Sequence, residues 1–146
     1  MAVYTTIDDP SEYFQTATYT GGGGGSSVVN DGNSDLQPDL VWFATREGNN
    51  KPLQDSTRGG NKNIYSDLSQ GADTTPSGVG IASFDSDGFT FGSTAQTYFN
   101  LTSKTYVAWQ WKAGGGTTAS NSDGSITSTV QANTTAGFSI VTSTGT

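Results

Sequence analysis

Two acidic stretches are the first places in this chain where side chains could do chemistry. Asp31-Gly32-Asn33-Ser34-Asp35 sets oxygen donors at alternate positions, which is how calcium-binding loops begin. Such a loop would continue with a glycine and end on a glutamate, whereas this chain has Leu36 and Trp42 at those positions. The segment is therefore expected to be a loop of Asx turns that holds no metal.

Asp85 and Asp87 form a second carboxylate pair, of the kind that glycoside hydrolysis requires. Such catalysis needs one carboxyl group tuned by an apolar pocket, and the polar sequence Asp85-Ser86-Asp87-Gly88 offers none. The two residues are more simply read as turn residues with solvated charges. The chain also has no His and no Cys, which excludes Ser-His-Asp and Cys-His hydrolases and zinc sites built on those residues. We expect no catalytic residues, no metal and no cofactor.

The aromatic side chains are the remaining candidates, because a flat ring can stack on a sugar as well as fill a core. Residues 106–112 alternate, so that Val107, Trp109 and Trp111 share one face of a strand. Aromatic residues at alternate positions of a sheet more often belong to the core. Trp42, Trp109 and Trp111 are therefore expected inside.

Tyr98 and Phe99 are the aromatic pair expected at the surface. They precede Asn100, which favours a turn. If the protein binds a glycan, these two side chains are the expected contacts.

Charge and hydropathy exclude several partners. The chain of 146 residues has a net charge of −7, and its six basic residues are scattered singly. Binding to nucleic acid or to an anionic membrane surface needs clustered Lys and Arg, so neither is expected. No apolar run approaches the roughly 20 residues that span a bilayer, and the N-terminus has no signal-peptide pattern. Any exit from the cell is expected to occur by lysis or inside an assembled particle.

The composition predicts an all-β fold. Thr, Ser, Gly and aromatic residues are abundant, while straight-chain helix formers are scarce. We expect an antiparallel β-sandwich, with its clearest buried strand at 38–46 and a hairpin across Asp85-Ser86-Asp87-Gly88. The glycine run 21–25 lacks the Lys-Ser/Thr ending of a phosphate-binding loop and is expected to be a flexible loop tip.

The chain divides into four expected parts. Residues 1–13 form an extended N-terminal arm, 14–113 the sandwich domain, 114–124 a Gly/Ser/Thr linker, and 125–146 the start of a second β unit. In the arm, Val3, Tyr4 and Ile7 are apolar anchors for docking. The arm either pairs with the sheet edge of a neighbouring subunit or forms the first strand of its own sandwich, and the sequence leaves both open.

The end of the chain echoes an earlier segment. Residues 137–145 repeat the Phe, two Thr and closing Gly of residues 13–21 at a constant offset. A true repeat would mean that a second sandwich begins where this sequence stops. On that reading the chain is a fragment of a longer protein.

Several stretches together resemble repetitive virion structural proteins of tailed phages, especially marine ones, with concanavalin A-like or SPRY-like domains. The resemblance spans most of residues 2–145 and is carried by the segments 2–14, 38–42, 53–59, 83–92 and 106–115. It implies a jelly-roll or concanavalin A-like sandwich in a tail fibre, spike or other appendage of the virion. It implies as partners other virion proteins (tail, adaptor or capsid subunits) and further copies of the chain, with a trimer favoured. The alternative is a lectin-like module that binds a host surface glycan.

Overall fold

The computed structural model describes residues 7–145, and its regular structure is β apart from one short 3-10 turn. All strand pairs are antiparallel, which confirms the expected fold class. The elements are η1 (Pro10–Glu12), β1 (Phe14–Thr20), β2 (Ser27–Val29), β3 (Leu40–Thr45), β4 (Pro52–Asp55), β5 (Gly59–Tyr65), β6 (Asp73–Thr74), β7 (Ile81–Asp85), β8 (Gly88–Phe91), β9 (Thr105–Trp111), β10 (Ala119–Asn121), β11 (Ser128–Asn133) and β12 (Phe138–Ser143).

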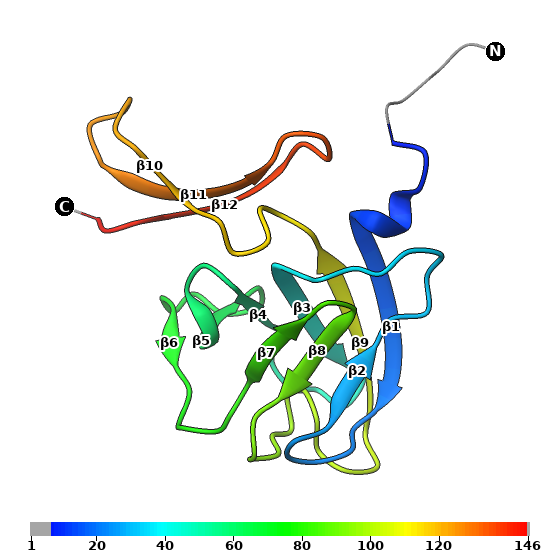
Figure 1. The fold of residues 1–146 in the computed structure, drawn as a ribbon. Coiled ribbons are helices and arrows are strands. Elements are labelled where there is room, and N and C mark those ends of the chain that lie inside the picture. The colour runs from blue at the N-terminus through cyan, green and yellow to red at the C-terminus, as the bar shows by residue number, and fades with distance from the viewer. Residues whose placement is uncertain (1–6, 146) are drawn as a thin grey trace.

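The strands form three sheets (Figure 1). A six-stranded sheet has the order β1-β9-β3-β4-β5-β6, and a three-stranded sheet, β2-β8-β7, packs on one side of it. The last three strands form a separate sheet of order β10-β11-β12, which lies across the end of the other two where β1 begins and β9 ends. We call this third layer the C-terminal sheet. Residues 7–145 contain no helical segment with the length and hydropathy of a membrane span.

The core lies between the six-stranded sheet and β2-β8-β7. Phe43 is completely buried at its centre, with ring centroids 5.5 Å from Phe89, 5.8 Å from Phe91 and 5.3 Å from Phe99. Burying a side chain of this size contributes roughly 1.5–3 kcal/mol relative to leaving it exposed. The buried cluster comprises Val28, Val41, Phe43, Val79, Ile81, Phe89, Phe91, Phe99 and Ala108.

The tryptophans lie on the other side of the six-stranded sheet, so their expected place in the core is wrong. Alternation separates the two faces of β9 as predicted, but the buried face carries Tyr106, Ala108 and Gln110. Gln110 is accommodated inside because its Nε2 donates a 2.5 Å hydrogen bond to Oδ1 of Asn30. Trp109 and Trp111 are left half-buried on the outward face, and Trp42 lies there too because its neighbours in β3, Val41 and Phe43, point inward.

The predicted hairpin is confirmed between β7 and β8. Asp85 pairs with Gly88 across the two-residue loop Ser86-Asp87. The backbone of Gly88 has a φ of +106°, and a Cβ there would strike the carbonyl oxygen of Val28 in β2. Gly88, the first residue after the two-residue loop, therefore adopts the positive φ that the turn requires, and glycine does so without steric cost.

The glycine run 21–25 is a loop, as expected, and backbone hydrogen bonds tie it to three neighbouring segments. Gly21 N donates to Lys104 O at 2.8 Å, Gly23 N to Asn100 O at 2.9 Å and Gly25 N to Gly92 O at 2.8 Å. The run thereby connects β1 to β2 in close contact with the ends of β8 and β9.

A buried carboxylate joins the C-terminal sheet to the rest of the molecule. Asp39 is fully buried, and its two oxygens accept from the backbone N–H groups of Ala113 (2.7 Å), Gly115 (2.8 Å) and Gly116 (3.1 Å) and from Oγ of Ser56 (2.7 Å). The segment 114–124 is expected to be a linker. Its first residues donate backbone hydrogen bonds to Asp39, and it also contains β10.

Gln131 in β11 makes a second connection. Its Oε1 accepts from Gly116 N at 2.8 Å, and its Nε2 donates to Oγ of Ser56 at 2.9 Å and to Oγ1 of Thr57 at 2.7 Å. The side chain is fully buried, so these bonds satisfy the polar groups that the interface takes out of water.

Candidate functional site

The side chains that point away from the core form a distinct surface on the six-stranded sheet. In the strand ladders Trp109 lies between Thr16 of β1 and Trp42 of β3, and Leu53 of β4 lies next to Trp42. Paired residues of adjacent strands share a face, so these side chains form a row across the sheet. We call this surface the tryptophan face; it is formed by Phe14, Thr16, Thr18, Leu40, Trp42, Ala44, Leu53, Ile64, Thr105, Val107, Trp109 and Trp111.

The rings on this face are held in place by their neighbours. Trp42 and Trp109 have centroids 5.1 Å apart at an interplanar angle of 45°, and Nε1 of Trp42 donates to Oγ of Ser66 at 3.1 Å. Trp111 contacts Phe14 at 5.0 Å and stacks on Phe138 of the C-terminal sheet at 6.2 Å. The C-terminal sheet thus contacts this face at Trp111, one residue pair beyond the Trp42–Trp109 pair.

Beyond the tryptophan pair the face is hollowed into a groove of about 350 Å³. The two residues next to the tryptophans along β3 and β9 on this face are small, Ala44 and Val107, and they face each other across the ladder. Hydroxyl side chains and one guanidinium surround this hollow; its lining is Thr18, Ala44, Thr45, Arg46, Thr105, Tyr106 and Val107. Arg46 is exposed and makes no ion pair with any residue that the structure describes.

Three basic residues lie at or beside this face, and the acidic residues near them, Asp67 and Glu47, are paired with Lys51 and Lys104. Arg46 follows β3, Lys62 lies in β5 two residues before Ile64, and Lys51 precedes β4. Lys51 is paired with Asp67 at 3.6 Å, and the backbone N–H of Lys51 is the main cause that lowers the pKa of that carboxyl. The only acidic residue within β1, β3, β4, β5 and β9 is Asp55, which is buried and paired with Arg58.

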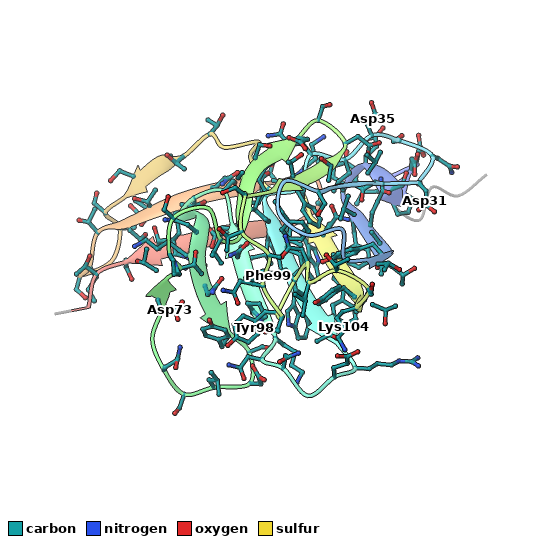
Figure 2. The ribbon with its side chains drawn as sticks, turned by 90° about the horizontal axis from the view of Figure 1, so that it is seen from below. Asp31, Asp35, Asp73, Tyr98, Phe99 and Lys104 are labelled. Carbon is teal, nitrogen blue, oxygen red and sulfur yellow. The ribbon has the colours of Figure 1, made fainter. Side chains whose placement is uncertain are left out.

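Phe99 is not available as a surface contact, so its expected exposure is wrong. The backbone N–H groups of Phe99 and Asn100 donate to Gln96 O at 3.3 and 3.0 Å, and this turn directs the Phe99 ring into the core, where it is completely buried. Tyr98 is half-buried against it, with centroids 6.0 Å apart (Figure 2). Tyr98 alone of this pair retains exposed surface.

The arm is described only from Ile7 onward; Val3 and Tyr4 lie outside the described residues. Ile7 is half-buried and lines an apolar pocket of about 380 Å³ together with Pro10, Tyr13, Phe14, Trp111, Ala136 and Phe138. Asp9 caps η1 by accepting from Ser11 N at 2.9 Å, and hydrogen bonds from Ser11 and Ser34 lower the pKa of this carboxyl. Docking through the arm stays a prediction.

The acidic residues considered for catalysis hold local structure. Asp85 accepts hydrogen bonds from Oγ of Ser83 at 2.7 Å and from Oγ1 of Thr90 at 2.6 Å, and Asp87 accepts from Leu36 N at 3.3 Å. These bonds brace the β7–β8 hairpin and join it to the loop before β3, in keeping with the interpretation as turn residues.

Asp31 and Asp35 lie exposed in the loop that follows β2 (Figure 2). Gln15 organises this loop: its Nε2 donates to Ser34 O at 2.7 Å and its Oε1 accepts from Gly32 N at 3.0 Å. Among residues 7–145 no group of three or more His, Cys, Asp or Glu side chains is placed to hold a metal ion.

The arrangement on the tryptophan face suits binding by contact. It offers two half-buried indole rings packed against each other, a groove with hydroxyl-bearing residues in its lining and a guanidinium without a described ion-pair partner, which together match the general make-up of a ligand site. Sequence patterns alone do not reveal this site, because they favour buried tryptophans and give Arg46 no distinguishing feature. One signal was available: residues 16, 18 and 20 of β1 are all Thr, which suits a strand face open to water better than a core.

Comparison with known proteins identifies the family of this chain. No curated protein and no solved structure matches the chain. The model of the family described as a domain of unknown function, DUF7483, matches residues 9–146, which is nearly the whole chain. The chain therefore belongs to the DUF7483 family.

Proposed function

We propose that this chain is a non-catalytic structural and attachment module of a tailed-phage virion, located in a tail fibre, spike or other particle-attached appendage. The observation that carries the proposal is the tryptophan face on an all-β scaffold, where half-buried aromatic rings lie outside the core, since aromatic surface that stays partly open to solvent marks interaction sites. The resemblance of residues 2–145 to virion structural proteins supplies the setting. It also favours a jelly-roll or concanavalin A-like arrangement for the two sheets that enclose the core.

A role without catalysis is supported by how the carboxylates are used. Asp39 binds backbone N–H groups, Asp55 pairs with Arg58, and Asp85 accepts from two hydroxyl groups of its own hairpin. A glycosidase needs two carboxyl groups that face one substrate across a cleft. Each of these three instead holds a turn or a connection.

The proposed partners are other virion proteins, namely tail, adaptor or capsid subunits, together with further copies of this chain in a trimer. Docking would use the arm, with Val3, Tyr4 and Ile7 as apolar anchors. The apolar pocket of about 380 Å³ that Ile7 helps to line supports a docking role for this end of the molecule.

Particle composition tests this function. Mass spectrometry of purified particles from the encoding phage is expected to find this chain in a fixed ratio to the capsid protein. Antibodies against the chain are expected to label an appendage by electron microscopy. Particles that lack the chain, or a chain found only in lysate outside the particles, would contradict the proposal.

A lectin-like role remains the second candidate, and the tryptophan face favours it. Of the expected contacts, Phe99 has no exposed surface and is not available to a glycan, whereas Tyr98 retains some.

A further inference from the structure

We infer that the tryptophan face binds an extended glycan chain that carries carboxylate groups, lying along β3 and β9 from the Trp42–Trp109 pair to Arg46. This inference names the surface and the ligand class for the attachment role proposed above, and it rests on that role.

The tryptophan pair provides the stacking platform. The apolar face of a pyranose ring packs on an aromatic ring, which is how amphipathic aromatic side chains bind ligands that are apolar on one side and wet on the other. Trp42 is oriented by its hydrogen bond to Ser66, and Trp109 is fixed against it at 5.1 Å. Because both rings are already ordered, a ligand would lose little affinity to side-chain ordering.

The groove extends the platform in the direction of the strands. Ala44 and Val107 line it, and Thr18 and Thr105 bring hydroxyl groups to the same face of the sheet. Hydroxyl groups can both donate and accept, which suits the many hydroxyl groups of a sugar. A second and a third sugar unit would therefore find polar partners here after the first had stacked on the tryptophans.

The guanidinium of Arg46 favours a ligand that carries carboxylate groups. Arg46 stands in the groove lining without a described ion-pair partner, and Lys62 and Lys51 lie on the same side of the sheet. A guanidinium binds a carboxylate through two parallel hydrogen bonds. The acidic residues nearby, Asp67 and Glu47, are paired with Lys51 and Lys104, which leaves Arg46 as the groove residue whose charge has no described ion-pair partner.

Two other polymers fit less well. An extended peptide would seek free backbone groups, and the groove lies on the face of a sheet where β1, β9 and β3 are paired with one another. Single-stranded nucleic acid would need a basic track along its backbone, and this face has three basic residues, one of them already paired with Asp67.

A matched pair of ligands tests the inference. Oligogalacturonate and its methyl ester have the same backbone and differ in charge. Calorimetric titration of the purified chain at low salt is expected to detect binding of both, with the acid form bound about five times more tightly, as expected for one exposed charge pair. No heat of binding with either ligand, or equal affinity for both, would overturn the inference, as would equally tight binding of oligo(dT).

Three variants assign the binding to this face. Arg46→Gln is expected to remove the preference for the acid form and to leave the affinity for the ester unchanged. Trp109→Ala is expected to lower the affinity for both ligands about tenfold, as for the loss of one aromatic anchor. Lys112→Gln removes the same charge from the residue after β9, where alternation directs it away from this face, and is expected to bind like the parent chain. Unchanged binding by Arg46→Gln with the fold intact by circular dichroism would overturn the site.

The result separates the two proposals. A chain that is found in the particle and binds neither ligand keeps its structural role and loses this site. A chain that binds the acid form through Arg46 and Trp109 but is absent from particles keeps the site and loses the virion role.

Discussion

A single carboxylate, Asp39, holds together parts of the chain that are far apart in sequence. Its oxygens accept four hydrogen bonds, three of them from the backbone N–H groups of residues 113, 115 and 116. Hydrogen bonds to a charged group stabilise more than neutral ones, and buried donors left without a partner are costly. The connection to the C-terminal sheet should therefore depend strongly on this side chain.

Asp39→Ala is expected to lower the free energy of unfolding by roughly 3–5 kcal/mol, because three backbone donors lose a charged acceptor. Asp39→Asn should be nearly as harmful, since its NH₂ group would face N–H groups.

Urea denaturation measures both effects, and limited proteolysis should show faster cleavage within residues 114–124. Asp35→Asn, at an exposed loop position, is the control and should change stability by less than about 0.5 kcal/mol. Similar stability of the Asp39 and Asp35 variants would contradict the assigned role.

Tyr19 makes the stability of the protein sensitive to alkaline pH. Burial, with a further contribution from nearby Tyr106, raises the pKa of the Tyr19 hydroxyl well above its ordinary value, and the hydroxyl donates to Phe99 O at 2.6 Å. A group whose pKa is higher in the folded state contributes stability that is complete below the unfolded pKa and is lost as pH rises above it. The relevant window therefore begins near pH 10.

The free energy of unfolding is expected to be nearly flat from pH 7 to 9 and to fall above pH 10 by about 1.4 kcal/mol per pH unit for each such tyrosine. Tyr19→Phe should lose about 1 kcal/mol at neutral pH with its hydrogen bond, and should show a shallower alkaline decline. Chemical denaturation across this pH range measures both. An unchanged alkaline slope in the variant would show that Tyr19 does not ionise on unfolding.

The β7–β8 hairpin depends on one glycine at the point where β2, β7 and β8 meet. Gly88 has a φ of +106°, and its Cα lies against the backbone of Val28. Gly88→Ala should therefore combine backbone strain with displacement of β2 and cost at least about 3 kcal/mol. Gly48→Ala is a matched control, because Gly48 also has a positive φ (+72°) but open space around it, and should cost about 1–2 kcal/mol. Thermal melting compares the two, and equal losses would mean that the contact with Val28 is unimportant.

Local patterns predicted which segments are strands better than they predicted which face of a strand is buried. The hairpin at Asp85–Gly88 and the two faces of β9 follow from turn chemistry and alternation, and the structure confirms both. The inner face of β9 carries Gln110, and the acceptor for its buried Nε2 is Oδ1 of Asn30, which lies in a distant loop that the pattern of β9 does not reveal. Likewise Phe99 is buried because Phe43 and Phe91 surround it, and neither contact can be read from the residues beside it.

The candidate site was hidden for the same reason. Alternation shows that Trp109 and Trp111 share one face of a strand, but the sequence of a strand does not tell whether that face packs on the core or is open to water. The buried face of the six-stranded sheet is the one on which β2-β8-β7 packs, and the tryptophans lie on the other face. The groove could not be predicted either, because Ala44 and Val107 become neighbours only through the pairing of β3 with β9.

Charge is distributed unevenly over the molecule as a whole, and this carries a prediction that needs no ligand. The net charge is −7, yet all three tryptophans lie on the face that also bears Arg46, Lys51 and Lys62. With each quencher scaled to its effect on free N-acetyltryptophanamide, iodide should quench the tryptophan fluorescence more strongly than caesium at low ionic strength if local charge governs access. If net charge governs access, caesium should be the stronger quencher on this scale. Because the Debye length falls to about 10 Å at 0.1 M salt, added neutral salt should shrink the difference. Arg46→Gln should weaken quenching by iodide more than Lys112→Gln does. Stronger quenching by caesium in the parent chain would show that the surface around the tryptophans has no basic character. The inference of an acidic glycan would then lose its electrostatic basis.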